Sequence, residues 1–438
     1  MRRSLISKIK SDSGAGQQLA FSPQGVFYGW IILLVSFVAS LVGFGVYYAF
    51  GVFFSDLQQA FSANRADVSL ISSICIGTIL SSGVVYGWAV DRYGPRIPIA
   101  LGGIVAFAGL MLASHASHLW QLYLSLGFLV GLGTGATTVP TISALSHWFV
   151  KMRGFVIGIA SAGAAAGMMV IAPLSQHLLS CYGWRATFTL LGVVYLIIFG
   201  ICAFLIRGDP SEKGMLPYGA TESSKDVALE KTSLQTSIEP EFSVRDAIRS
   251  SKSWLIMGIK MVLPVVTFMV NTHLVNFAKD AGVPAQSAAM LMTVVGAVSI
   301  AAKIGAGHLA DKVGSCIIVI VCSAVMVGQM LYFASPRGAK FLPVSAVIYG
   351  MMYGGTFPVL NIIVTETFGL KQLGKTLGLL NVAGAIGSLI GPWLGGYIFD
   401  TAGSYSIAFI VAAGCSAISV ILAILLEKRT RKEALPQH

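Results

Sequence analysis

Charged residues are scarce in this chain. Asp, Glu, Lys and Arg make up 11% of its 438 residues, against roughly 25% in soluble domains, whereas hydrophobic residues make up 55%. The six cysteines show no CxxC spacing, and the sequence contains no HExxH, GxSxG or phosphate-loop motif. These absences argue against a disulfide framework, a metal site, an enzyme and an ATP-driven machine, and we expect no cofactor.

Long apolar runs take the place of these motifs. Runs of about 17–25 residues are long enough to cross a bilayer as helices. Twelve such runs lie near residues 28–53, 68–89, 97–115, 120–147, 154–176, 184–206, 254–277, 287–309, 316–334, 341–364, 375–398 and 405–426. Their close spacing leaves no room for a separate soluble domain. The sequence therefore predicts an all-α membrane protein with twelve transmembrane helices.

The chain repeats itself at an offset of about 220 residues. Residues 87–96, GWAVDRYGPR, match residues 307–316, GHLADKVGSC, and each copy is a short polar hinge between apolar runs. The matched landmarks are Gly87, Asp91, Arg92 and Gly94 with Gly307, Asp311, Lys312 and Gly314, and then Gly131, Gly135, Gly167 and Pro173 with Gly350, Gly354, Gly387 and Pro392. Two copies of a six-helix unit are typical of a transporter, with the substrate site between the halves.

The net charge of +11 is better explained by topology than by nucleic-acid binding. With the N-terminus in the cytoplasm, 22 of the 29 Lys and Arg residues fall on the cytoplasmic side and 5 on the outer side. This asymmetry follows the positive-inside rule. We therefore expect both termini in the cytoplasm, and a plasma membrane, most simply a bacterial inner membrane.

These observations divide the chain into five parts. They are a cytoplasmic tail at 1–27, a six-helix bundle at 28–206, a cytoplasmic linker at 207–252, a second six-helix bundle at 253–427 and a tail at 428–438. The linker holds 15 of the 47 charged residues and is typical of a solvated, partly disordered segment. Its end, from Phe242, has the pattern of a short amphipathic helix, which either guides the chain into span seven or has a regulatory role.

The doubled G-x-x-x-D-R/K-x-G hinge resembles the loop signature of the major facilitator superfamily over essentially the whole chain. The resemblance implies two six-helix bundles and a hinge that latches the cytoplasmic side. The gating residues that we expect from it are Asp91, Arg92, Arg96, Lys151, Arg153, Asp311 and Lys312. A simpler alternative stays open, in which these loops only end the helices and carry cytoplasmic positive charge.

Two segments resemble the monocarboxylate transporter family and its bacterial relatives, the oxalate:formate antiporter group. They are YGWIILLVSFVASLVGFGVYYAFGVFFSDL from Tyr28 and HWFVKMRGFVIGIASAGAAAG from His147. The resemblance implies a carrier of small carboxylates. Two positions tied to proton coupling in the animal carriers are occupied here by Tyr48 and Ser299, which leaves the coupling open. The second cation that the oxalate:formate branch carries in span eleven is absent, so a monoanion fits better than a dianion.

Lys303 is the charge that we expect to bind substrate. It lies eight residues before Asp311, about 12 Å along a helix, and no Asp or Glu of the membrane interior lies beside it. A charge inside a span costs roughly 2.5–3.5 kcal/mol on insertion scales and usually faces a cavity. The family resemblance implies the same role, because this position usually holds an Arg that binds the carboxylate. Snorkelling of Lys303 to the inner surface is the alternative.

Other polar residues lie within the spans. Lys260, six residues after Trp254, is better explained by snorkelling. His273 has three open interpretations: a carboxylate contact, a proton carrier, or a side chain satisfied by neighbouring helices. The further substrate-binding candidates are Asn271, Tyr47, Tyr48, Thr137, Tyr353 and Asn361.

The sequence thus predicts a secondary active transporter of small monocarboxylates such as lactate or pyruvate, with the proton as the candidate coupling ion. We expect it to work as a monomer in the lipid bilayer by alternating access, with a small organic anion as substrate and no nucleic-acid partner. An oxalate:formate-type exchanger, a multidrug exporter and a non-transporting receptor of the same fold remain alternatives. An exporter of cations would need an acidic residue in its cavity, and we find none in the membrane interior of the predicted spans.

Overall fold

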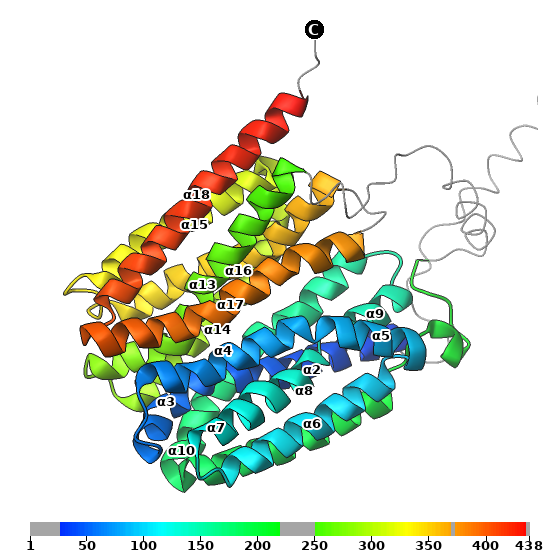
Figure 1. Ribbon diagram of the computed structural model, residues 1–438. Helices are drawn as coiled ribbons and strands as arrows, with labels where there is room; N and C mark the ends of the chain where they lie inside the picture. The colour runs from blue at the N-terminus through cyan, green and yellow to red at the C-terminus, as the bar shows by residue number, and fades with distance from the viewer. Residues whose placement is uncertain (1–26, 220–249, 369–372, 435–438) are drawn as a thin grey trace, which may run out of the picture.

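The computed structural model describes residues 27–219, 250–368 and 373–434, which are almost entirely helical. Figure 1 shows two groups of helices, one formed by α2 to α10 and the other by α13 to α18. We call residues 27–205 the N-terminal half and residues 251–434 the C-terminal half. The predicted all-α membrane fold is confirmed.

The N-terminal half provides six spans, three of which are interrupted. The first is α2 (Tyr28–Tyr48) with α3 (Phe50–Ala60), the second α4 (Arg65–Ser81) with α5 (Gly83–Tyr93), and the third α6 (Arg96–Ser114). The fourth consists of α7 (Leu119–Leu122), the π-helix η2 (Tyr123–Val130), α8 (Gly131–Gly135) and α9 (Val139–Trp148). The fifth and sixth together form α10 (Arg153–Leu205).

The C-terminal half provides six further helices, which are longer and less interrupted. They are α13 (Ser251–Asp280), α14 (Ala285–Val313), α15 (Ser315–Ala334), α16 (Leu342–Phe368), α17 (Leu373–Ala402) and α18 (Ser406–Ala434). The spans predicted from hydropathy correspond to these elements one by one, and the helices extend several residues beyond most of the predicted limits.

The count of twelve spans follows from a break inside α10. Eleven helical segments of the described residues are apolar and long enough to cross a membrane, and one of them is the 53-residue α10. A straight helix of that length would measure about 80 Å, far more than the roughly 30 Å hydrocarbon core. The backbone leaves the helical conformation at Gly183, where φ is 75°. Residue 183 therefore separates two spans.

The sequence repeat is also a packing repeat. Gly167 of α10 lies directly against the carbonyl oxygen of Leu41 in α2, and Gly387 of α17 lies directly against the carbonyl oxygen of Met261 in α13. Both members of the second pair lie 220 residues after those of the first. Small residues allow such close helix contacts in lipid, where apolar burial provides no drive between helices. The two halves therefore share one packing scheme.

The hinge glycines have the same role in both copies. Gly94 ends α5 with φ of 70° and donates from its N–H to Val90 O at 2.8 Å; Gly314 ends α14 with φ of 94° and donates to Ala310 O at 2.9 Å. Residues with a side chain rarely adopt this left-handed backbone conformation. The glycine of the motif is thus explained by local backbone geometry.

Several predicted segments fall outside the described residues. These are the N-terminal tail through residue 26, the linker from 220 to 249 with the helix expected from Phe242, and the last four residues. The start of the linker is ordered: Tyr218 donates from its N–H to Trp148 O at 2.9 Å, and Trp148 Nε1 donates to Arg207 O at 3.0 Å. Residues 207–219 therefore pack onto the N-terminal half.

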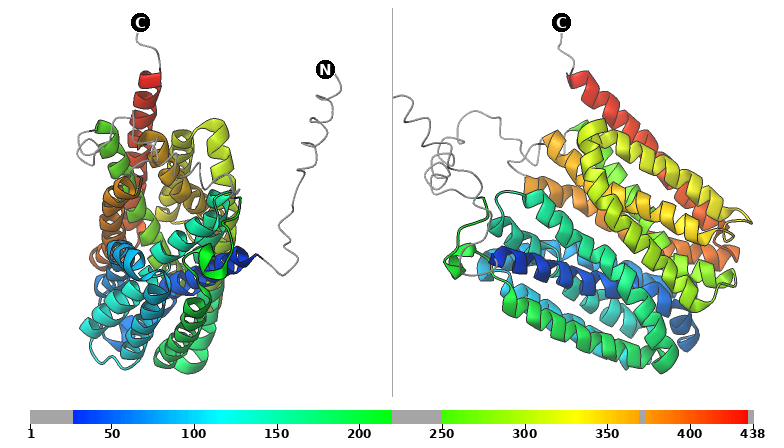
Figure 2. Two further views of the ribbon diagram at one scale, coloured as in Figure 1. Left: turned by 90° about the vertical axis from the view of Figure 1, so that its right-hand side faces the viewer. Right: turned by 180° about the vertical axis from the view of Figure 1, so that it is seen from behind.

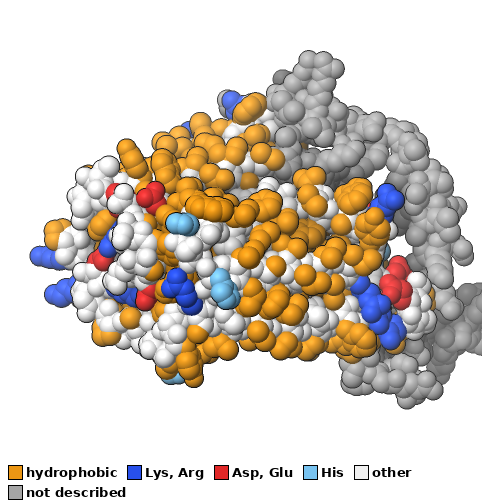
Figure 3. All heavy atoms as spheres, turned by 60° about the horizontal axis from the view of Figure 1, so that its bottom comes forward, with side chains coloured by type: hydrophobic (Ala, Val, Ile, Leu, Met, Phe, Trp, Pro, Cys, Tyr) orange, Lys and Arg blue, Asp and Glu red, His pale blue; other side chains and the backbone are white. Residues whose placement is uncertain are grey.

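The molecule has two chemically distinct ends. We call the end with Asp91 and Lys312 the hinge end, and the opposite end, with Arg65 and Asp280, the Arg65 end. The two groups of helices run between these ends in both views of Figure 2. Hydrophobic side chains cover most of the face in Figure 3, and charged side chains gather towards its two ends. This distribution suits a protein that crosses a bilayer.

Candidate functional site

Arg65 joins the two halves at one end of the molecule. It begins α4 in the N-terminal half and donates from Nη1 to Asp280 Oδ2 (2.6 Å) and from Nη2 to Asp280 Oδ1 (2.9 Å), at the end of α13. Nη1 also donates to the Tyr405 hydroxyl at 2.8 Å, and the guanidinium lies 3.7 Å from the ring centre of Phe399. A bidentate, stacked guanidinium is a geometry that lysine cannot reproduce.

Further contacts strengthen this closure. Asp400 of α17 accepts from the N–H groups of Arg65 (3.0 Å) and Ala66 (2.7 Å), so its carboxylate sits on the N-terminus of α4. Ser55 donates to Asn276 Oδ1 at 3.1 Å, and Lys279 donates to Val52 O at 3.2 Å. We refer to Arg65, Asp280, Asp400 and Tyr405 as the Arg65 cluster.

Near the middle of the molecule the halves meet through hydroxyl groups. The hydroxyl oxygens of Tyr48 in α2 and Tyr353 in α16 lie 2.5 Å apart, and those of Ser72 and Thr272 lie 3.0 Å apart. Among the described residues, no hydrogen bond or ion pair links the halves on the hinge side of the tyrosine pair. The structure therefore represents a state that is closed from the tyrosine pair to the Arg65 end.

Lys303 lies directly beneath the tyrosine pair. It is on α14, 15 Å from the helix end at about 1.5 Å per residue, and its Nζ lies 5.8 Å from the centre of the Tyr353 ring. The side chain is half-buried, and within the described part of the chain it has no acidic partner. Glu366, near the hinge end of α16, accepts from Ser315 Oγ at 2.8 Å.

Asn271 and Tyr349 extend this polar centre towards the Arg65 end. Tyr349 stacks on Tyr353 with ring centres 5.9 Å apart, and its hydroxyl donates towards Asn271 Oδ1 at 3.0 Å. The Asn271 Nδ2 group is buried without a partner in the described structure. The structure thus brings four of the predicted site residues together, namely Lys303, Tyr353, Tyr48 and Asn271.

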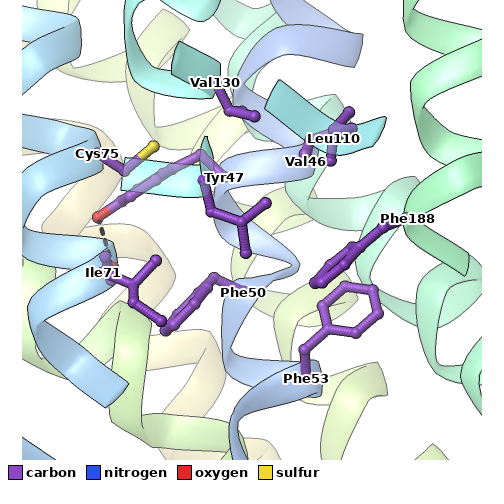
Figure 4. A pocket seen from close by; sticks show the side chains of 11 residues that line it. Val46, Tyr47, Phe50, Phe53, Ile71, Cys75, Leu110, Val130 and Phe188 are labelled. Atoms are coloured by element: carbon purple, nitrogen blue, oxygen red, sulfur yellow. Dashed lines mark hydrogen bonds between the residues drawn. The ribbon is translucent and has the colours of Figure 1, made fainter. Parts of the chain in front are cut away.

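Tyr47 lines a neighbouring apolar pocket in the N-terminal half. The polar lining of this pocket is limited to Tyr47 and Ser72, and Ser72 donates to the Tyr47 hydroxyl at 3.5 Å (Figure 4). Thr137 lies elsewhere: it is buried, donates to Thr134 O at 2.8 Å, and faces Gly43 of α2. The structure therefore does not bring Thr137 to the polar centre.

His273 belongs to the Arg65 end and not to the surroundings of Lys303. Its Nε2 donates to Pro392 O at 2.8 Å, so the neutral ring accepts at Nδ1 from the Tyr405 hydroxyl at 3.0 Å. That hydroxyl in turn accepts from Arg65. Both ring nitrogens of this buried histidine are occupied, which matches the interpretation of a side chain satisfied by neighbouring helices.

Lys260 does not snorkel, and the interpretation favoured from the sequence is wrong. Its side chain is only 5% exposed. The ammonium donates to Asn381 Oδ1 of α17 at 2.8 Å and to Asn361 Oδ1 of α16 at 3.1 Å. The predicted site residue Asn361 therefore contacts Lys260, two helical turns from Tyr353. Sequence spacing missed this contact because the three residues lie on three different helices.

Among the described side chains, the predicted gating residues form no contact with one another in this state. Arg96 donates to Ala203 O at 3.2 Å within its own half, and Arg92 lies over the rings of Trp88 and Tyr93 of its own helix. The described side chains of Asp91, Lys151, Arg153 and Lys312 are exposed, and Asp91 forms no ion pair with any other described side chain. The side chain of Asp311 lies outside the described part.

The Arg65 cluster was not predicted from the sequence. A signal was present, because the side that the positive-inside rule assigns to the outside holds only five basic residues, and Arg65, Asp280 and Asp400 all lie at span ends on that side. Nothing in the local sequence pairs residues that are 215 and 335 positions apart.

Comparison with known proteins agrees with this arrangement. The sequence pattern of the Major Facilitator Superfamily matches residues 35–342 and 255–438. The chain is 32% identical to monocarboxylate transporter 13 of Rattus norvegicus over 395 residues, covering 88% of this chain and 86% of the relative. It is 29% identical to monocarboxylate transporter 3 of the same species (91% and 80%) and 26% identical to human monocarboxylate transporter 2 (91% and 84%).

Solved structures share the fold. A bacterial homologue of the human lysosomal transporter Spinster, in an inward-facing and unoccupied conformation, superposes with a TM-score of 0.67 at 18% identity over 92% of this chain and 97% of that one. A D-xylose–proton symporter superposes with a TM-score of 0.68 at 14% identity over 91% and 97%. The protein is therefore an integral membrane transporter and not an enzyme, and it belongs to the monocarboxylate transporter family of the major facilitator superfamily.

Proposed function

We propose that this transporter carries small monocarboxylates by alternating access and binds their carboxylate at Lys303. The observation that carries the proposal is the half-buried ammonium of Lys303 beneath the Tyr48–Tyr353 pair, without an acidic partner in the described structure. An uncompensated cation in a low-dielectric site attracts an anion strongly. The relatives' names, which refer to monocarboxylates, support the same substrate class.

We propose further that the hinge end faces the cytoplasm of a cell bounded by its plasma membrane. The excess of Lys and Arg at the hinge end supports this orientation. The present state then opens inwards, with the Arg65 cluster sealing the outside. In the opposite state the hinge residues Asp91 and Asp311 pair with basic residues at neighbouring helix ends, and the Arg65 cluster separates.

Proton coupling is part of the proposal in a specific form. No Asp or Glu among the described residues lies beside Lys303, and His273 is held in the Arg65 cluster. A proton that moves with the anion therefore travels on the substrate and not on an acidic side chain of the site. Each transport cycle would then move one anion together with one proton, which is equivalent to moving one molecule of the neutral acid.

Counterflow in proteoliposomes tests the proposed substrate class. Lactate, pyruvate, formate, oxalate and acetate are compared with the purified wild type and with two variants of Lys303. We expect counterflow of at least one monocarboxylate, its loss in Lys303→Gln, and its retention in Lys303→Arg, because guanidinium also binds carboxylate. Normal transport by Lys303→Gln would remove Lys303 from the binding site.

A further inference from the structure

We propose that Lys260, Asn361 and Asn381 form a second carboxylate-binding position on the hinge side of Lys303. This inference rests on the proposed function and adds a second site to it. The three side chains come from α13, α16 and α17, and the Lys260 ammonium lies 3.1 Å from Asn361 Oδ1 and 2.8 Å from Asn381 Oδ1.

The chemistry of this cluster is that of an anion site. An ammonium has three N–H donors and no acceptor, so both amides must turn their oxygens towards it. Their two Nδ2 groups consequently face away from Lys260, and no hydrogen bond within the described residues uses them. The cluster thus presents one remaining ammonium proton and two amide groups, all of them donors. A carboxylate, which only accepts, is complementary to such a set.

The cluster is open to solvent although Lys260 itself is buried. The lysine side chain is 5% exposed, whereas Asn361 and Asn381 are both exposed. Asn361 lies on the side of α16 that carries Tyr353, and Asn381 lies two turns from Leu389, which packs against Gly77 of the other half. Amide groups at these depths are costly in lipid, so we infer that they face the space between the halves.

Position along the helices gives the cluster its role. Asn361 lies eight residues after Tyr353 on α16, so it is about 12 Å nearer the hinge end, at a rise of 1.5 Å per residue, than the tyrosine whose ring the Lys303 ammonium contacts. An anion that moves between the hinge end and Lys303 passes it. An anion that arrives from the Arg65 end, in the opposite state, reaches Lys303 first. The second position therefore affects the uptake of anions that arrive from the hinge end and not of those that arrive from the Arg65 end.

Uptake rates measured separately from each face of the membrane test this asymmetry. Full-length protein is reconstituted in one orientation, and initial rates of radiolabelled pyruvate uptake are measured from each face. For Lys260→Gln we expect the half-saturating concentration at the hinge-end face to rise about tenfold, and that at the Arg65-end face to stay within about twofold. Ser388→Ala is the matched control, because Ser388 is buried on α17 and its hydroxyl donates to Gly384 O, its sole hydrogen-bond partner among the described residues. An equal change at both faces would show that Lys260 has a structural role.

A second measurement does not depend on transport. The Asn381→Cys variant is labelled with an anionic and with a cationic thiosulfonate reagent. The labelling rate of the native cysteines, measured on the wild type, is subtracted from each rate. With Lys260 present we expect the anionic reagent to be favoured, and in Lys260→Gln we expect that preference to fall about tenfold. An unchanged ratio overturns the second position whatever the substrate is. A changed ratio together with no carboxylate counterflow by the wild type would keep the anion site and reject the proposed function.

Discussion

Tyr48 and Tyr353 meet across the two halves of the transporter, with their hydroxyl oxygens 2.5 Å apart although the residues are 305 positions apart in the chain. The ring of Tyr353 also lies over the Lys303 ammonium and stacks on Tyr349. One side chain therefore touches both the proposed carboxylate site and the contact that holds the halves together at mid-depth. An anion that binds Lys303 lies next to the link that has to open.

The tyrosine pair gives a prediction about the balance between conformations. Tyr48→Phe and Tyr353→Phe each remove the same hydrogen bond, whose net value is roughly 1 kcal/mol, so each should shift the equilibrium about fivefold away from the state closed at the Arg65 end. The double variant should shift it no further, because the two residues share one interaction. Labelling rates of a cysteine at the Arg65 end report the equilibrium. Additive effects would mean that the hydroxyl groups act separately.

Arg65 gives a prediction about the closure at the Arg65 end. Arg65→Lys keeps the charge but loses the fork that holds Asp280, and we expect access from the Arg65 end to increase roughly three- to tenfold. The matched control is Arg185→Lys, because Arg185 lies at the same end but donates to Ala116 O in its own half. Single-molecule distances between labels on the two halves measure the change. If both variants behave alike, the closure does not depend on the Asp280 pair.

Asp91 gives a prediction about the latch. The side chain is exposed and forms no ion pair with a described residue in the present state. Asp91→Asn should therefore leave thermal stability and pyruvate binding in this state unchanged, while turnover falls severalfold because the opposite state loses its latch. Turnover in proteoliposomes and a detergent melting curve separate the two effects. Normal turnover would favour the alternative that the loop only ends α5.

His273 gives a prediction about proton coupling. Both its ring nitrogens are engaged, by Pro392 O and by the Tyr405 hydroxyl. His273→Gln should therefore keep the acceleration of uptake by an imposed inward proton gradient, because the proton travels with the substrate. Loss of the pH response with uptake otherwise intact would instead assign the proton to His273. The comparison requires uptake with and without the gradient in both proteins.

A substantial part of the molecule could be predicted from the sequence alone. Hydropathy located the spans because a transmembrane helix satisfies its backbone within itself, so each span is a local property. The offset of 220 residues matched Gly167 with Gly387 and Gly94 with Gly314, and in the structure the first two pack alike and the second two end their helices alike. Lys303 stood out because an unpaired charge is rare in a span.

The contacts between helices were decided only by the tertiary structure. Hydropathy does not fix the rotation of a helix about its axis, since lipid and neighbouring apolar helices are similar surroundings for an apolar side chain. Lys260 was consequently assigned to the membrane surface. In the structure its ammonium instead contacts two asparagines, one on α16 and one on α17. His273 and Thr137 were among the substrate-binding candidates, and packing holds both away from Lys303. Arg65 pairs with Asp280 because the assembled halves bring together helix ends that are 215 residues apart in the chain.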